Sequence, residues 1–120
     1  MIRLLIELAS DGTAYVPAPC RGVVSGMKAV YQTNAVEPND TIIASRDTTA
    51  VNTLTAVTTA GLVVETGVPD ATNKGLVFDP ADTTAVNQVI KLVANGAAGV
   101  VLVMLEFDEY AYIAQAAKEA

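Results

Sequence analysis

Carboxylates are the main side chains in this sequence that could carry out chemistry. Asp79 and Asp82 lie three residues apart, and Asp47 stands at the same position as Asp82 in a six-residue word that occurs twice. Such a pair could do acid–base work or bind Ca²⁺. A structural role is the alternative, in which Asp47 and Asp82 accept hydrogen bonds from backbone amides of the Thr-Thr-Ala turn that follows each. We favour the structural role, because calcium takes about six to eight oxygen ligands and no dense Asp, Asn and Gly loop supplies them.

The other reactive residue types are absent or isolated. The chain has no His, which is the commonest general base and transition-metal ligand. None of Ser10, Ser25 and Ser45 lies in a Gly-x-Ser-x-Gly motif. Cys20 is the single cysteine, and we expect it to be a small buried hydrophobic residue, with an intermolecular disulfide or a reactive thiol as the alternative. We therefore predict a protein that is not an enzyme and has no metal or cofactor.

A cluster of acidic and aromatic residues lies near the C-terminus. Glu106, Asp108 and Glu109 are followed by Tyr110 and Tyr112. The cluster is either the solvated end of a strand or a contact surface. In a contact surface, the tyrosines contribute a large area at low entropic cost, and the acidic residues meet a basic partner. Neither interpretation implies catalysis.

Length, composition and charge restrict the class of protein. The 120 residues suit one domain, and the 52% of hydrophobic residues can bury a core, which argues against intrinsic disorder. The net charge is −6 and the basic residues are scattered singly, so nucleic-acid binding is not expected. The apolar stretch at residues 1–8 is interrupted by Glu7 and is too short for a signal peptide. The longest apolar run, residues 97–105, is far below the roughly 18–20 residues of a membrane helix, so no membrane segment is expected.

The repeated word is Asp-Thr-Thr-Ala-Val-Asn, at residues 47–52 and again at residues 82–87. Each copy follows a short apolar pair and leads into a run rich in β-branched residues. This arrangement predicts the same strand–turn–strand unit at two places, and therefore an all-β domain with internal pseudo-symmetry.

Further strand signals run along the whole chain. Period-two alternation and β-branched runs predict strands at residues 2–8, 13–16, 22–32, 41–45, 54–57, 62–65, 76–78, 89–93 and 100–107. Gly26 is expected to mark a bulge or a close backbone approach. The last two runs are joined by an Asn- and Gly-containing loop, which predicts a hairpin.

Short strands with no helical pattern between them predict an all-β fold. We expect a single-domain antiparallel β-sandwich, jelly-roll-like or immunoglobulin-like, over residues 1–107. Residues 108–120 are rich in good helix formers and are expected to form a C-terminal extension or a short helix.

The chain resembles the small head decoration, or cement, proteins of tailed bacteriophages. The features that carry the resemblance are a short N-terminal strand, a Val-Pro segment followed by a long strand, a Thr- and Ala-rich middle, and a closing hairpin. The carrying segments are residues 15–24, 41–43, 47–59, 89–96 and 100–107. The resemblance covers residues 2–107 and is compositional and architectural, without a strict motif.

The resemblance implies a non-enzymatic β-sandwich that is made in the host cytoplasm and binds the outer surface of an assembled capsid. Such proteins often bind as trimers and stabilise the virion by bridging major capsid subunits. A ligand that binds only the assembled shell stabilises it by mass action. We expect the contacts to come from Arg3 and Glu7 and from Tyr110, Tyr112 and Ile113, because termini that are free of the core can reach neighbouring subunits.

Two other functions compete with capsid decoration. The first is a binding module of a phage fibre or a bacterial surface protein that recognises a carbohydrate or host receptor. Glycan sites usually present Trp or Tyr platforms, and this chain has no Trp, so we rank it second. The second is an enzyme that uses only carboxylates, such as a lyase or glycosidase, for which 120 residues form a poor cleft.

Overall fold

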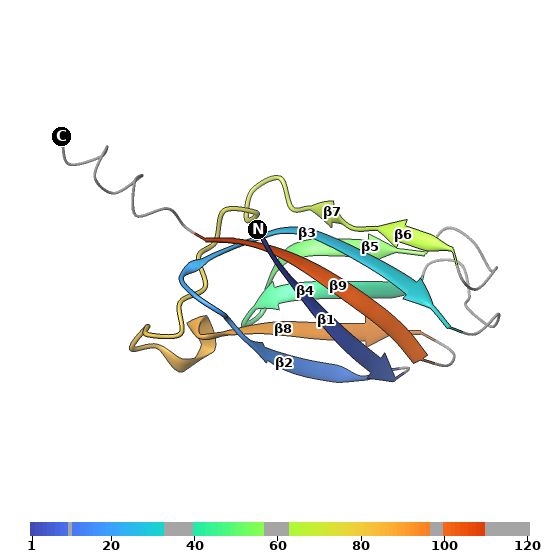
Figure 1. The fold of residues 1–120 in the computed structure, drawn as a ribbon, viewed down its shortest axis with the longest axis horizontal. Coiled ribbons are helices and arrows are strands. Elements are labelled where there is room, and N and C mark those ends of the chain that lie inside the picture. Colours follow the sequence, from blue (N-terminus) through green and yellow to red (C-terminus); the bar gives the residue numbers. More distant parts are fainter. Residues whose placement is uncertain (10, 33–39, 57–62, 97–99, 110–120) are drawn as a thin grey trace.

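The computed structural model describes residues 1–9, 11–32, 40–56, 63–96 and 100–109. In this part of the chain the elements are almost all strands (Figure 1). They are β1 (Ile2–Ala9), β2 (Thr13–Pro17), β3 (Gly22–Tyr31), β4 (Thr41–Arg46), β5 (Thr49–Thr55), β6 (Val64–Thr66), β7 (Val68–Pro69), the 3₁₀ helix η1 (Ala85–Asn87), β8 (Val89–Asn95) and β9 (Val100–Glu109).

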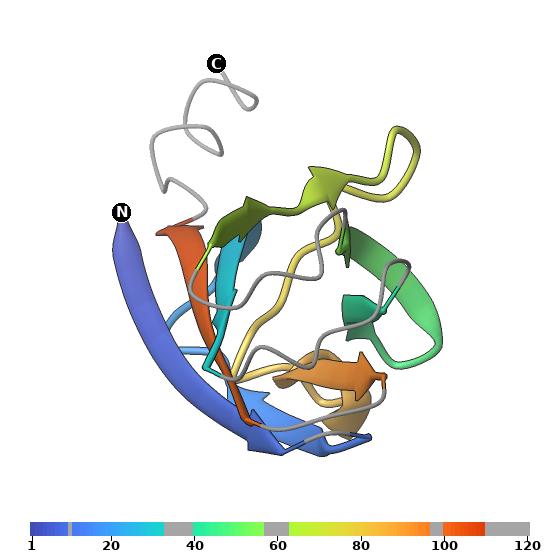
Figure 2. The same ribbon diagram turned by 90° about the vertical axis from the view of Figure 1, so that its right-hand side faces the viewer.

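The strands form two antiparallel sheets that pack face to face. One sheet has four strands in the order β1-β9-β3-β6, and the other has five in the order β2-β8-β4-β5-β7. Seen along the strands, the sheets are two facing layers with the core between them (Figure 2). The β-sandwich that the sequence predicts is therefore confirmed.

Alternation along each strand produces the core. On β9, Val101, Val103, Leu105 and Phe107 are buried, whereas the residues between them are only half-buried. The opposite sheet contributes the buried residues Ile42, Ala44, Val51, Leu54, Ile90 and Leu92. Because successive side chains of a strand point to opposite faces, the spacing of these residues determines which face packs inward.

The bulge expected at Gly26 is present on β3. The register between β3 and β9 shifts between Val24 and Gly26. A Cβ atom at residue 26 would lie 2.7 Å from Oε1 of Glu106. Glycine therefore allows the close approach of the two strands at this point.

The hairpin expected between residues 89–93 and 100–107 is wrong. β8 pairs with β2 and β4 in the five-stranded sheet, whereas β9 pairs with β1 and β3 in the four-stranded sheet. The chain thus crosses from one layer to the other between these strands. The buried residues of both strands belong to the same core cluster, so each sheet contributes one of the two strands to the core.

Three other strand predictions need correction. β5 begins at Thr49, inside the first copy of the repeated word, and not at Leu54. The strand expected at residues 76–78 is a single bridge between Phe78 and Gly22. The strand expected at residues 62–65 appears as β6, which begins at Val64.

The four-stranded sheet extends past the expected boundary at residue 107. Asp108 pairs with Val23, and Glu109 pairs with Gly22 at the start of β3. The extension or helix expected after this point falls on residues 110–120, which lie outside the described residues, and it stays a prediction.

Candidate functional site

The two copies of the repeated word have different structures. In the first copy, Asp47 and Thr48 form the turn between β4 and β5, and Thr49 to Asn52 belong to β5. In the second copy, Ala85 to Asn87 form η1. The expected repeated strand–turn–strand unit is therefore wrong, because only the first copy pairs with a neighbouring strand.

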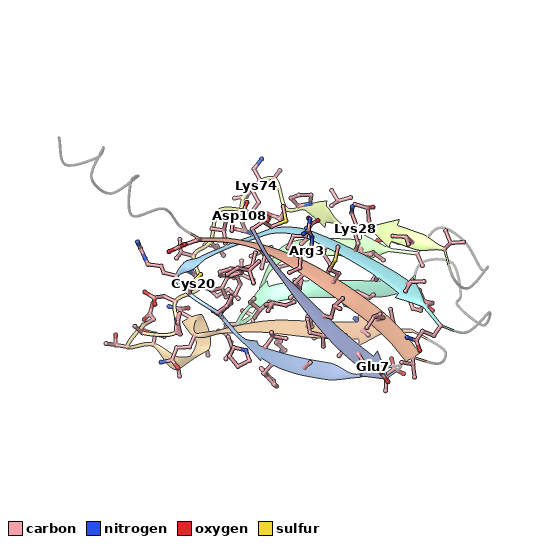
Figure 3. All side chains as sticks on the ribbon, viewed as in Figure 1. Arg3, Glu7, Cys20, Lys28, Lys74 and Asp108 are labelled. Carbon is pink, nitrogen blue, oxygen red and sulfur yellow. The ribbon has the colours of Figure 1, made fainter. Side chains whose placement is uncertain are left out.

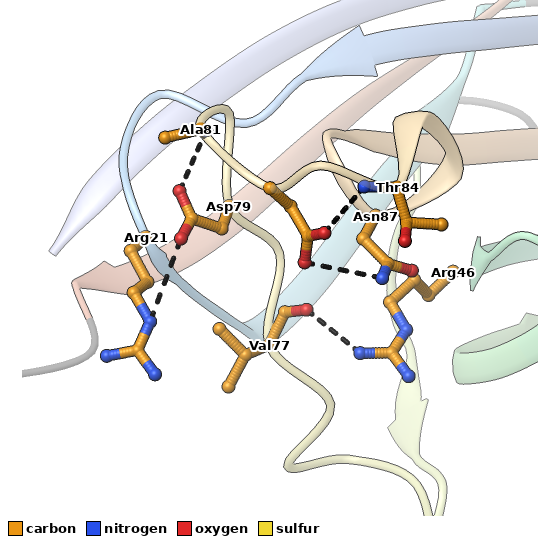
Figure 4. A network of polar contacts seen from close by, with 8 residues as sticks. Arg21, Arg46, Val77, Asp79, Ala81, Thr84 and Asn87 are labelled. Atoms are coloured by element: carbon orange, nitrogen blue, oxygen red, sulfur yellow. Dashed lines mark hydrogen bonds and ion pairs between the residues drawn. The ribbon is translucent and has the colours of Figure 1, made fainter.

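The carboxylates of Asp79 and Asp82 each accept a hydrogen bond within their own turn. Figure 4 shows Asp79 between Ala81 and Arg21. Oδ1 of Asp79 accepts a hydrogen bond from the amide of Ala81 at 2.9 Å, and its Oδ2 lies 3.8 Å from Nε of Arg21. Oδ1 of Asp82 accepts from the amide of Thr84 at 2.8 Å. These are Asx-type turns, in which the carboxylate replaces a backbone acceptor.

Two further hydrogen bonds to Asp82 stabilise the second copy of the repeated word. Nδ2 of Asn87 donates to Oδ2 of Asp82 at 3.3 Å, and Nε2 of Gln88 donates to the carbonyl of Asp82 at 2.7 Å. Asp47, its counterpart, has a φ of 56°. Asp tolerates this left-handed conformation better than most residues. Asp47 therefore allows the backbone to make the turn between β4 and β5.

Metal-ligating groups do not gather in the described part of the chain. No three His, Cys, Asp or Glu side chains of these residues are close enough together to hold an ion. The pair Asp79 and Asp82 therefore has no third such side chain close enough to complete a metal site in the described residues.

Cys20 is half-buried and packs against the core. Burial raises the pKa of its thiol, and the negative charge of Glu109 raises this pKa further. Because the thiolate is the nucleophilic form, this environment favours the packing role over the reactive thiol.

The outer face of the four-stranded sheet carries a group of apolar side chains. The strand register places Leu5 beside Met104, and Leu102 beside Val30, which in turn pairs with Val64. We call these five residues the apolar strip. They surround a shallow hollow of about 180 Å³, which is also lined by Lys28 and Ala29.

The apolar strip is exposed at both of its edges. Leu5 on β1 is 68% exposed and Val64 on β6 is 65% exposed. In an antiparallel sheet with one solvated face, the outward positions are usually polar. The apolar strip is therefore a candidate interaction surface.

Charged residues flank the apolar strip. Arg3 pairs across the ladder with Glu106, and Glu7 pairs with Leu102. Figure 3 shows Arg3 and Glu7 near opposite ends of β1, with Lys28 on the same sheet. The structure therefore places the two described contact candidates, Arg3 and Glu7, on one face on either side of Leu5.

The remaining contact candidates, Tyr110, Tyr112 and Ile113, lie outside the described residues. The apolar strip itself was missed in the sequence. Its signal is the run at residues 100–105, in which both the inward and the outward positions of β9 are apolar.

A second hollow of about 170 Å³ lies on the five-stranded sheet. It is lined by Tyr15, Asp47, Val86, Val89 and Lys91. Tyr15 on β2 is 64% exposed. The lining thus combines an exposed aromatic ring with one acidic and one basic side chain.

Comparisons with known proteins identify no relative. No protein-family model, no curated protein and no solved structure matches the chain. The resemblance to decoration proteins stays a prediction that these comparisons leave untested. In the described part of the chain, no helix has the length and apolar character needed to cross a membrane.

Proposed function

We propose that this protein is a non-enzymatic structural protein that binds the outer surface of an assembled phage capsid and stabilises it by contacting major capsid subunits. The observation that carries the proposal is the apolar strip on the outer face of the four-stranded sheet. The site of action would be the virion surface, reached after synthesis in the host cytoplasm.

The anatomy of this face supports a protein partner. Protein interfaces typically have an apolar, well-packed centre and a polar rim. Leu102 and Met104 lie on the inner strand β9, and Arg3 and Glu7 lie with Leu5 on the edge strand β1. A broad, shallow surface of this type fits another protein surface better than a small substrate.

Stabilisation of a capsid by such a face is a linkage effect. A protein that binds the assembled shell and not its dissociated subunits shifts the equilibrium toward the shell. Several copies on one shell add modest contacts together by avidity. This role needs no catalytic group.

Quantitative mass spectrometry of density-purified phage particles tests the proposal. We expect a high and fixed copy number relative to the major capsid protein. A few copies for each particle would point to a fibre component, and absence from the particles would overturn the proposal.

A substitution in the apolar strip tests the docking face. We expect Val64→Lys to weaken binding to particles stripped of this protein at least about tenfold, because burying a valine contributes about 1.5–3 kcal/mol and an unpaired buried charge is costly. Co-sedimentation of the purified variant with stripped particles measures the effect.

Val68→Lys is the matched control for this substitution. Val68 is 69% exposed, close to the 65% of Val64, but it lies on β7 of the other sheet. Its substitution should leave particle binding unchanged. Equal losses from both variants would argue against docking through the apolar strip.

The hollow at Tyr15 supports a second function, that of a carbohydrate-binding module. The Tyr15 ring offers a stacking platform, and Asp47 and Lys91 offer an acceptor and a donor for sugar hydroxyls. Under this function we expect a specific signal on a glycan array that Tyr15→Ala abolishes. The absence of any such signal from the unaltered protein would remove this candidate.

A further inference from the structure

The free edge of β1 is different from the other three sheet edges in the described structure. β1, β6, β2 and β7 are the four edge strands. β6 has three residues, and β7 has two and ends at Pro69. β2 has five residues and ends at Pro17. These are the short and proline-bearing edges by which proteins avoid pairing with another chain.

β1 has none of these protections. It is eight residues long, contains no Pro or Gly, and pairs with β9 in an unbroken register from Ile2 to Ala9. Its charges, Arg3 and Glu7, lie on the outer face and do not point into the core. An edge of this length with regular geometry presents a row of backbone donors and acceptors to another strand.

The sequence of β1 is complementary to itself about Leu5. If two copies of β1 pair antiparallel with Leu5 opposite Leu5, then Arg3 of each copy lies opposite Glu7 of the other. The inner positions match as well, since Leu4 lies opposite Ile6 and the remaining pair is also apolar. Opposite charges and apolar pairs directly across two strands stabilise a sheet.

Other registers lose this match. A shift that keeps the faces aligned places Arg3 or Glu7 opposite Leu5, or places two like charges opposite each other. Like charges directly across a strand pair are destabilising. Among the registers that keep the faces aligned, the charge pattern therefore favours the one centred on Leu5, and a second copy of this chain supplies the matching charges.

We propose that two copies of this protein pair through β1, antiparallel and centred on Leu5, and form a continuous eight-stranded outer sheet. The contact is isologous, so the same patch is used on both copies and the assembly closes at two. The two apolar strips then lie on the same face of the joined sheet. This inference does not depend on capsid binding, and it replaces the trimer implied by the resemblance with a dimer.

Charge reversal tests the pairing. Sedimentation of the unaltered protein should show a species of twice the 12.4 kDa chain mass. Arg3→Glu and Glu7→Arg, made singly, each create two like-charge pairs and should raise the dimer Kd at least about tenfold. The double variant, Arg3→Glu with Glu7→Arg, exchanges the charges and should recover the dimer.

Of the two single variants, Glu7→Arg changes the contact between copies without adding a like-charge pair within one copy. Residue 7 pairs across its own sheet with Leu102, whereas residue 3 pairs with Glu106, so Arg3→Glu adds a repulsion within one copy. Thermal melting of each variant separates this effect from dimer loss. A monomeric unaltered protein, a trimer, or a dimer whose Kd is the same in Glu7→Arg would each overturn the proposal.

Cross-linking tests the register. In a Cys20→Ser background, Leu5→Cys should form an intermolecular disulfide under mild oxidation, because Cα atoms directly opposite in an antiparallel pair are about 4.5–5.5 Å apart, within the range for disulfides. Arg3→Cys alone should not cross-link, but a mixture of Arg3→Cys and Glu7→Cys proteins should. Leu5 is 68% exposed, so the substitution leaves the core intact. Failure of Leu5→Cys to cross-link would overturn the register.

Discussion

Phe78→Ala is expected to lower the free energy of unfolding by about 3–5 kcal/mol, the range observed when a buried Phe is truncated to Ala. Phe78 is fully buried, and its ring centroid lies 6.5 Å from that of Phe107 in a tilted arrangement. The loss would be a large part of the roughly 5–15 kcal/mol that stabilises a typical domain. Urea denaturation followed by circular dichroism measures the change.

Phe78 has this importance because it anchors the long connection between β7 and β8. Its amide donates to the carbonyl of Gly22 at 2.8 Å, and the amide of Gly22 donates back at 2.9 Å. A Cβ atom at residue 22 would lie 2.2 Å from the carbonyl oxygen of Asp108, so glycine is required for this approach. Phe78 and Phe107 thus join this connection to the core cluster.

Val86→Ala is the control for the Phe78 substitution. Val86 lies in the same connection but is 42% exposed, so its truncation should change the stability by less than about 0.5 kcal/mol. The loss of stability in Phe78→Leu should lie between those of Phe78→Ala and Val86→Ala. This variant can be measured even if Phe78→Ala does not fold. A loss below about 1 kcal/mol for Phe78→Ala would show that the connection does not contribute to the core.

Asn52→Val is expected to raise the stability by about 1–2 kcal/mol, because an unsatisfied buried polar group carries a desolvation penalty of this order. Asn52 is fully buried, and neither its Oδ1 nor its Nδ2 has a hydrogen-bond partner among the described residues. Valine suits a strand position and is small enough for a site that packs tightly against Gly67. Thermal and urea denaturation measure the gain.

Asn87→Val is a matched control, because Asn87 occupies the same position in the second copy of the repeated word. Its side chain donates to Asp82 and is half-buried, so its substitution should lower the stability by about 0.5–1.5 kcal/mol. The same replacement in the same word is thus expected to act in opposite directions. A lower melting temperature for Asn52→Val would contradict our account of the buried amide.

Local patterns in the sequence predicted most strands well. On β1, Ile2, Leu4, Ile6 and Leu8 alternate with the outward residues, and the structure has a strand there. Gly26 was identified as a bulge for a local reason, the absence of a Cβ. These features depend on the steric preferences of a few neighbouring residues, and those preferences follow directly from residue type.

The repeated word shows where local patterns fail. Six identical residues form a turn and strand after β4, but a turn and 3₁₀ helix before β8. The first copy has the hydrogen-bonding edge of β4 beside it, and the second is held by the bonds of Asp82 to Thr84 and Asn87. Identical local preferences therefore allow both conformations, and the neighbours select one.

The candidate docking face was only partly predictable. Arg3 and Glu7 were identified as contact residues because they lie near a terminus. That they flank Leu5 on one face follows from the alternation of β1 alone. That Leu102, Met104 and Val64 complete this face depends on the pairing of β1, β3, β6 and β9.

Periodicity and residue type over short distances account for the class of fold, the position of most strands and the self-complementary charge pattern of β1. The assignment of β8 and β9 to different sheets, the difference between the two repeat copies and the outward-facing apolar strip follow from tertiary contacts. A strand can satisfy its backbone hydrogen bonds with any suitable neighbour. The choice among neighbours is made by packing between residues that are far apart in the chain.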